Sequence, residues 1–534
     1  MAKDHSQKNF SDKTTKLHFN KIALACAIVV ASSGASAFEL DTGNSDLKAR
    51  WDSTIKYSVV TRIQDADASG KGVNAGAYAG GDVSSIVSLG DLNFAKKGVV
   101  SNRWDLYSEA DFTFQEKWGA RVSGAAWYDS KYQGDNFPRD TRELMGQKTE
   151  LLDAFIFGRF EIGNDRPGSF RLGKHALTWG ETLFFGSNGV AGAMAPVDYI
   201  KLFNVPGSQF KEVMLPVNQV SGQIQVSPEL SLGAYYQMEW EPNRIPAAGA
   251  FSSYSSAFGE GRGTILGYLP SGGDNKPNKS QFGFQAKIRP ANMDTDFGLY
   301  ALKFNQKDPS MVTGWGMMPG TPFDYRLAYH EDQNLIGGSA STTIGSANVG
   351  IEASVRNNVA LVNSNGLGSS NPTTTFWPIG RTGHLNVPMV QLLSPTALWD
   401  GGNLLAEVGW NRLLSVSQNA GNIDPNATRD AWGMRLIFSP TYFQVLNGLD
   451  VSVPIGLGYN PKAKSSSVAM FNGGVNKGGD FSIGVVGDYE KKIKMGLTYT
   501  TYLGDAGPVF TNALTYQQYY KDRSTINATV EMSF

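Results

Sequence analysis

Apolar and polar residues alternate one for one along many short stretches of this chain. The C-terminal stretch 523–534 shows the pattern most clearly. Its apolar row is Ile526, Ala528, Val530, Met532 and Phe534, and its polar row is Asn527, Thr529, Glu531 and Ser533. A period of two residues is typical of a β-strand with one apolar and one polar face. The pattern therefore predicts an all-β chain.

We predict eighteen strands on this basis, with sixteen as the alternative count. They are 50–62, 102–116, 118–128, 150–162, 169–178, 217–227, 230–240, 280–289, 296–306, 335–345, 348–358, 385–395, 402–412, 430–440, 448–459, 480–489, 492–503 and 523–534. Pro454 lacks a backbone N–H and indicates a bulge inside 448–459. In a membrane barrel the apolar row of each strand faces lipid and the polar row faces the lumen. A water-soluble sandwich shows the same alternation with the faces exchanged, so one strand alone does not distinguish the two.

The lengths of the connections favour the barrel. With both termini placed in the periplasm, the short connections all fall on the periplasmic side: Lys117, 227–229, 345–347 and 490–491. The long connections then all fall outside: 63–101, 179–216, 241–279, 307–334 and 359–384. Short periplasmic turns and long extracellular loops are typical of outer-membrane barrels. We therefore predict a closed transmembrane antiparallel β-barrel surrounded by outer-membrane lipid.

Both ends of the chain carry signals of export. Residues 1–37 combine a lysine-rich start, a short apolar run and a small-residue cleavage site, which is typical of a secretory signal peptide. We predict cleavage before Phe38, so that 38–534 forms one barrel domain. The terminal strand ends in Phe534 and resembles the signal by which the barrel-assembly machinery recognises its clients, and that machinery is an expected partner.

Composition excludes several other classes of protein. The chain has 534 residues, one cysteine and a formal net charge of −1. Because Cys26 lies inside the predicted signal peptide, the mature chain would hold no disulfide, and a closed strand ladder is the expected source of stability. The near-neutral charge gives no basic surplus for nucleic acid. Beyond residue 40, no stretch approaches the ~20 consecutive apolar residues that a membrane helix requires.

Candidate chemistry is sparse. The part after residue 37 has three histidines, His175, His330 and His384, and none stands in a nucleophile motif such as G-x-S-x-G. It has no cysteine and no close histidine pair to bind a metal ion. The sequence therefore predicts no catalytic, cofactor or metal site and a protein that is not an enzyme. An outer-membrane lipid hydrolase is the weakest alternative, and it would require a histidine within hydrogen-bond reach of a serine or aspartate at the bilayer surface.

Charged residues occur in the polar rows of the early strands. One row is Arg103, Asp105, Glu109 and Asp111, and a neighbouring strand is expected to face it with Asp153, Arg159 and Glu161. In a barrel these residues would line the lumen wall. Mixed charges in such a wall either brace it and hold a plug or select a substrate, and we weigh the structural role above the selective one.

The long loops are unusually apolar for exposed segments. Their apolar residues include Leu183, Phe184, Phe185 and Met194, the stretch 247–251, and 311–318 with Trp315. Such residues either pack on one another or, in loops that fold inward, line a path for a hydrophobic passenger. Our candidate residues for a substrate path or gate are Trp179, Glu181, Phe184, Phe185, Met194 and Trp315. The structural alternative is a loop held by a buried tryptophan and by an ion pair of Glu181 with Arg171 or Lys174.

Several stretches carry a resemblance to a known family. They are 171–181 (RLGKHALTWGE), 196–198, 206–212 and 235–242, together with 90–94, 337–356 and 522–523. These stretches resemble a family of proteobacterial outer-membrane proteins of unknown function, over nearly the whole mature chain. Where relatives carry Arg-Gln, this chain has Lys174-His175, so no role is assigned to that pair.

The resemblance implies a barrel that is encoded beside a periplasmic or lipoprotein partner with a lipid-carrier (LolB-like) fold and beside an inner-membrane efflux-type permease. It implies movement of hydrophobic compounds or lipids across the envelope, without a direction. The leading hypothesis is thus an outer-membrane conduit for hydrophobic or lipid-like compounds, gated by its long loops. The alternatives are a general or small-solute porin and a surface structural or adhesive barrel. Apolar loops folded inward would favour the first, an open polar channel the second, and outward loops the third.

Overall fold

The computed structural model describes residues 38–66, 90, 93–163, 166–205, 208, 210–264, 269–315, 323–363, 377–511 and 513–534. The signal peptide predicted for 1–37 lies outside these residues. Cleavage before Phe38 therefore stays a prediction.

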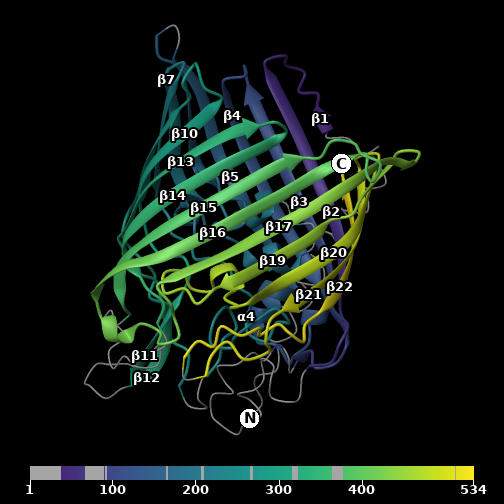
Figure 1. Cartoon of the computed structure of the whole chain (residues 1–534). Coiled ribbons are helices and arrows are strands. Elements are labelled where there is room, and N and C mark those ends of the chain that lie inside the picture. The colour runs from purple at the N-terminus through teal and green to yellow at the C-terminus, as the bar shows by residue number, and fades with distance from the viewer. Residues whose placement is uncertain are drawn as a thin grey trace, which may run out of the picture.

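The described strands form a closed antiparallel barrel of eighteen strands, as the alternating pattern predicted (Figure 1). The wall consists of β2 (Leu47–Arg62), β3 (Gly98–Phe114), β4 (Trp118–Asp129), β5 (Gln147–Glu161), β6 (Pro167–His175), β7 (Val217–Ser227), β8 (Leu230–Gln237), β9 (Gln281–Ile288), β10 (Thr295–Phe304), β13 (Gln333–Ile344), β14 (Ala347–Ala360), β15 (Ile379–Leu392), β16 (Gly401–Gln418), β17 (Asp430–Leu446), the interrupted strand β18 (Leu449–Ser452) with β19 (Ile455–Lys462), β20 (Gly478–Tyr489), β21 (Ile493–Leu503) and β22 (Thr525–Ser533). The ring closes where β22 pairs with β2. Phe534 takes part in this closure, because its N–H donates to the carbonyl of Ser53 at 2.9 Å.

The remaining described elements are short. They are β1 (Phe38–Leu40), which pairs with β2; the hairpin β11 (Ser310–Trp315) and β12 (Phe323–Ala328); and the helical turns η2 (Ser130–Tyr132), α4 (Arg139–Thr141), η3 (Arg142–Gly146), η4 (Val190–Ala193), α5 (Tyr199–Asn204), α6 (Phe210–Val213), η5 (Ala420–Asn422) and η6 (Phe471–Gly473). Within the described residues, no helix is long and apolar enough to cross a bilayer. The hairpin β11–β12 lies inside 307–334, which the sequence predicted only as a loop.

The two faces of the wall differ in chemistry. Large apolar side chains on the outer face are exposed, among them Trp104 on β3, Leu497 on β21 and Val530 on β22. The alternate positions carry polar residues that lie buried inside the barrel, such as Lys56 and Glu352. An apolar belt that surrounds the whole wall requires lipid rather than water outside. The chain is therefore an outer-membrane barrel, and the water-soluble sandwich is excluded.

The connections sort by length between the two ends of the barrel (Figure 1). Short turns, such as the one between β13 and β14 at Gly345 and Ser346, gather at one end, where β2 also begins and β22 ends. The long connections lie at the other end, including 176–216 after β6 and 238–280 after β8. This asymmetry is the one that the sequence predicted.

Pro454 has a larger effect than the predicted bulge. It divides the expected strand 448–459 into β18 and β19. The ladder continues around the break because the N–H of Val453 donates to the carbonyl of Pro440 and the N–H of Gly484 donates to that of Pro454. The missing proline N–H is thus accommodated without opening the wall.

A charge placed on the outer face should impair assembly. Leu497 is 55% exposed and pairs across the ladder with Val485 and Ala528. Leu497→Arg should cost about 2–4 kcal/mol, since an arginine near the middle of the bilayer must be desolvated. The folded fraction in outer membranes, measured by heat-modifiable gel mobility, should fall. Thr498→Arg at the neighbouring inward position is the control, and equal folded fractions for both variants would contradict the assigned faces.

Candidate functional site

Within the loop 176–216, here called the crossing loop, the described residues 176–205, 208 and 210–216 pass through the interior of the barrel. The loop begins after β6 and returns to β7, yet its backbone contacts β14 and β16. The wall runs from β6 through β7, β8, β9, β10, β13, β14 and β15 to β16, so β16 stands eight strands further round. Eight of eighteen strands is nearly half of the ring. The crossing loop therefore spans the lumen from one wall to the opposite wall.

Two buried glutamates of the opposite wall hold the crossing loop, and we call Glu352 and Glu407 the carboxylate anchors. Glu407 Oε2 accepts three consecutive backbone N–H groups, from Leu183 at 3.0 Å, Phe184 at 2.5 Å and Phe185 at 3.2 Å. Glu352 accepts from the N–H of Val190 at 2.7 Å and from the N–H of Glu181 at 2.8 Å. Each anchor is 1% exposed. Successive backbone N–H groups that converge on an anion make strong, charge-assisted hydrogen bonds.

The loop residues 187–189, which lie between the contacts to Glu407 and the contact made by Val190, make further polar contacts with the wall. Arg356 donates to the carbonyls of Ser187 at 3.0 Å and Gly189 at 2.8 Å. The side chain of Asn188 donates to Asn386 Oδ1 at 3.0 Å, and its own Oδ1 lies 2.9 Å from His384 Nδ1. The loop is thus fixed by hydrogen bonds that its backbone and the side chain of Asn188 make with side chains of the wall.

Gly180 makes the approach to Glu352 possible. Its φ is +99°, a conformation that side chains disfavour. A Cβ atom at this position would also lie 2.1 Å from Glu352 Oε2. Glycine is therefore needed at position 180 for two reasons: the positive φ of the backbone and the close approach of the Glu352 carboxylate.

The crossing loop buries apolar and aromatic side chains against the wall. Trp179 contacts Tyr235 edge-on with ring centroids 5.1 Å apart and lies 6.5 Å from the ring of Tyr300. Further along, Phe185 stacks on Phe471 at 5.4 Å. The same cluster as Trp179 includes Val190, Ala193, Met194, Leu302, Phe304 and Leu335. The middle of the barrel is therefore filled with an apolar layer.

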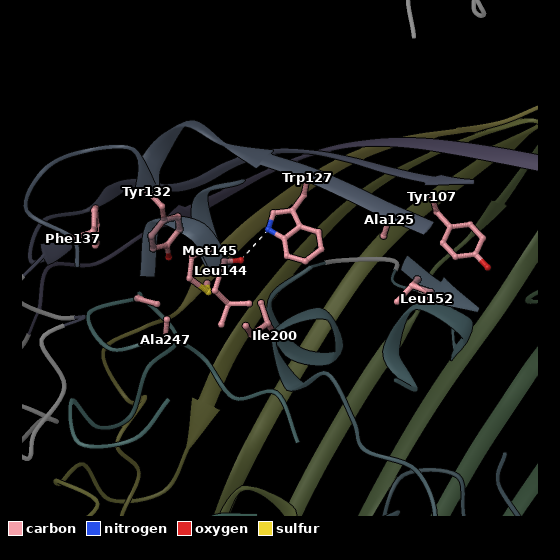
Figure 2. Close-up of a cluster of buried hydrophobic side chains, with 11 residues drawn as sticks. Tyr107, Ala125, Trp127, Tyr132, Phe137, Leu144, Met145, Leu152, Ile200 and Ala247 are labelled. Atoms are coloured by element: carbon pink, nitrogen blue, oxygen red, sulfur yellow. Dashed lines mark hydrogen bonds between the residues drawn. The ribbon is translucent and has the colours of Figure 1, made fainter. Parts of the chain in front are cut away.

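The described part of the loop 238–280, residues 238–264 and 269–280, also folds inward and adds to this layer. Ala247 and Ala250 are fully buried in a cluster with wall residues of β3, β4 and β5. Figure 2 shows Trp127 of this cluster with its indole N–H directed at η3, where it donates to the carbonyl of Leu144 at 2.9 Å. Arg62 and Arg523 flank the ring of Phe251, each 5.7 Å from its centroid. We call this loop and the crossing loop together the loop layer.

Most of the predicted wall charges occur in compact pairs. Arg103 binds Asp105 at 2.7 Å, and Arg121 binds Asp111 at 2.6 Å. Glu109 lies 3.8 Å from Lys211, which belongs to the crossing loop. Asp153 accepts a hydrogen bond from Ser123, whereas Arg159 and Glu161 are exposed toward the short-turn end. Both the bracing role and the selective role of these wall charges stay predictions.

The structure brings five of the six candidate gate residues together in the crossing loop: Trp179, Glu181, Phe184, Phe185 and Met194. Trp315 belongs to β11, where its backbone pairs with Phe323. The ion pair expected for Glu181 is wrong, because Glu181 Oε1 accepts from Ser339 at 3.3 Å and Lys174 donates to the carbonyl of Leu151. Whether these residues gate a substrate stays a prediction.

The histidines were the remaining candidates for chemistry. His175 Nε2 lies 2.8 Å from Ser221 Oγ, so a His–Ser contact does exist. The second ring nitrogen lies 3.0 Å from the carbonyl of Gly173 rather than facing a carboxylate. Both side chains are buried beneath the loop layer. In the described ranges, no group of three or more His, Cys, Asp or Glu side chains could hold a metal ion.

A buried lysine makes the loop layer sensitive to pH. Lys307 follows β10 and donates to the carbonyl of Ala193 in the crossing loop at 3.1 Å. Burial lowers the pKa of Lys307 to about 7. Since the unfolded chain keeps a pKa near ~10.4, the unfolded state binds more protons between these values, and stability should rise as the pH increases from about 7 to about 10.

Thermal midpoints recorded across this pH range measure the effect. In the wild type the midpoint should increase with pH by a few degrees. Lys307→Met should lose this slope, because the titrating group is gone. An identical slope in the variant and the wild type would contradict the assignment to Lys307.

The chain matches one family model and resembles several solved structures. The family described as "Protein of unknown function (DUF1302)" matches residues 19–534. Among curated proteins no match is found. Solved structures that resemble the chain include OccAB1 of Acinetobacter baumannii (TM-score 0.46, 9% identity, 94% of this chain and 98% of that one) and OccD3 (OpdP) of Pseudomonas aeruginosa (TM-score 0.40, 9% identity, 94% and 93%).

Proposed function

Because the chain belongs to the DUF1302 family, whose function is unknown, we propose its role from its own geometry: a gated outer-membrane conduit for hydrophobic or lipid-like compounds. The crossing loop is the gate, and the carboxylate anchors hold it closed. A periplasmic carrier of LolB-like fold would exchange the compound at the short-turn end, and an efflux-type permease of the inner membrane would work in the same system.

The observation that carries this proposal is the way in which the crossing loop is attached. Its contacts with β14 and β16 are hydrogen bonds to the side chains of Glu352, Glu407 and Arg356 rather than strand pairing. Such contacts can break and reform without disturbing the barrel ladder. A segment that spans the lumen on reversible contacts is suited to open.

The chemistry of the loop layer supports a hydrophobic passenger. When the crossing loop moves, Trp179, Met194 and the wall residues Tyr235 and Tyr300 would be uncovered at the opening. Aromatic rings and a flexible thioether bind apolar compounds of varied shape. A path of this kind would stabilise a sugar or an inorganic ion poorly.

A small-solute porin remains the alternative, since inward Gln223 is exposed beneath the loop layer and offers a polar lining. Purified protein in planar bilayers, together with uptake of a hydrophobic fluorophore into proteoliposomes, distinguishes the two. The conduit predicts little steady ion conductance and measurable fluorophore uptake above protein-free vesicles. A large, steady conductance without fluorophore uptake would establish the porin and overturn the proposal.

A further inference from the structure

The inward rows of the wall show where the loop layer ends. His175 on β6 is 1% exposed, whereas Arg171, four residues closer to the short turns, is exposed. On the adjacent strand β7, Ser221 is 8% exposed and Gln223 is exposed. Since Leu172, the neighbour of Arg171 in sequence, is on the lipid-facing row, Arg171 points into the lumen. It is the first side chain of β6 that the loop layer leaves uncovered.

Arg171 has no hydrogen bond or ion pair within the part of the chain that the structure describes. The nearest charged groups are Arg121 and Asp153. Both already have partners, because Arg121 binds Asp111 and Asp153 accepts from Ser123. A guanidinium group with all its donors free and open to the lumen is ready to bind an acceptor from outside the chain.

An aromatic strip lies beside this free guanidinium group. Phe155 and Phe157 share the inward row of β5, with ring centroids 6.3 Å apart, and the guanidinium carbon of Arg171 lies 5.6 Å from the Phe155 ring. Gly119 on β4 allows Phe157 to lie flat, since a Cβ there would be 2.3 Å from the ring. Phe155 and Phe157 are both half-buried, so part of each ring remains open to a ligand.

We propose that Arg171, Phe155 and Phe157 form a lumenal binding site for amphiphiles with a carboxylate head and an apolar body. The guanidinium group donates to both carboxylate oxygens, and the two rings pack against the adjoining carbon chain. The site lies directly beneath the gate, where a compound that has passed the crossing loop would first meet the open lumen. The inference rests on the proposed function and specifies its substrate class.

Ligand binding tests the site without relying on transport. Dodecanoate and dodecanol, which share an apolar chain and differ in the head group, are titrated into the barrel in nanodiscs, with empty nanodiscs subtracted. The wild type should bind dodecanoate roughly tenfold or more tightly than dodecanol, because the guanidinium group makes charge-assisted hydrogen bonds to the carboxylate head and not to the neutral alcohol. Arg171→Gln should remove this preference, and Arg171→Lys should restore part of it.

Matched variants separate the site from a general effect of charge. Arg159→Gln changes an exposed arginine of the same inner wall near the short turns, and it should keep the preference. Phe155→Ala should weaken binding of both ligands. Equal binding of dodecanoate and dodecanol by the wild type, or an unchanged preference in folded Arg171→Gln, would overturn the proposal.

The outcome also distinguishes this inference from the proposed function. If fluorophore uptake occurs but dodecanoate is not preferred, the conduit stands and the carboxylate site fails. If dodecanoate is bound with preference but no hydrophobic compound is taken up, the site stands as a binding site and the conduit fails.

Discussion

Replacing both Glu352 and Glu407 with alanine should produce a barrel that conducts small ions steadily. The anchors accept five backbone N–H groups of the crossing loop. A hydrogen bond to a charged group contributes about 1.5–3 kcal/mol. Losing only about 3 kcal/mol in total would shift the balance toward the open loop by roughly a hundredfold, since about 1.4 kcal/mol corresponds to a factor of ten. Single-channel recordings measure the open time directly.

The control for this variant is a glutamate that touches no loop residue of the lumen. Glu490 lies in the short turn between β20 and β21 and is exposed, so Glu490→Ala should leave the conductance unchanged. Heat-modifiable mobility establishes that each variant is folded. Should the folded double variant remain as closed as the wild type, the carboxylate anchors do not hold a gate.

The barrel itself could be predicted from the sequence because its determinants are local. In 523–534 the side of each residue follows from its neighbours two positions away, and the same is true of every strand. The Pro454 break was only partly predicted. Proline removes a donor wherever it stands, but whether the strand bulges or divides depends on the partners, here Pro440 and Gly484.

The attachment of the crossing loop could not be predicted in the same way. Glu407 meets Phe184 across 223 residues, and Glu352 meets Val190 across 162. In the sequence both anchors are ordinary polar residues of an alternating strand, and nothing in their neighbourhood indicates a loop partner. The predicted ion pair of Glu181 was wrong for the same reason. Proximity in sequence suggested Arg171 or Lys174 as the partner, whereas in the fold the hydroxyl of Ser339 donates to the Glu181 carboxylate.

The wall charges could be predicted in part, less fully than the barrel and more fully than the attachment of the crossing loop. Arg103 and Asp105 stand two residues apart on one strand, so the row and the pair were both visible in the sequence. The free state of Arg171 was not visible, because it depends on Arg121 and Asp153 being occupied by residues of other strands. Pairing along a strand is local, whereas the absence of a partner is a property of the assembled wall.

Joining the crossing loop to the wall by a disulfide should abolish transport. The side chains of Asn188 and Asn386 meet at 3.0 Å, which makes this pair the candidate for two cysteines. Because a disulfide requires Cβ atoms about 3.5–4.5 Å apart, formation of the bridge is verified on gels before uptake is measured. The only natural cysteine, Cys26, lies in the predicted signal peptide, so the pair would be alone in the mature chain. Oxidised Asn188→Cys/Asn386→Cys should lose nearly all fluorophore uptake, and a reductant should restore it.

The disulfide and the double alanine variant change the attachment of the crossing loop in opposite directions, the first at Asn188 and Asn386 and the second at the carboxylate anchors. A gate that moves predicts higher conductance when the anchors are removed and no uptake when the loop is bridged. A fixed structural loop predicts higher conductance in the first case but unchanged uptake in the second. Each single cysteine variant is the control and should transport under oxidising conditions, although Asn188→Cys should open more readily because it also loses the hydrogen bond to His384. Full uptake by a barrel shown on gels to be bridged would place the passage elsewhere than at the crossing loop.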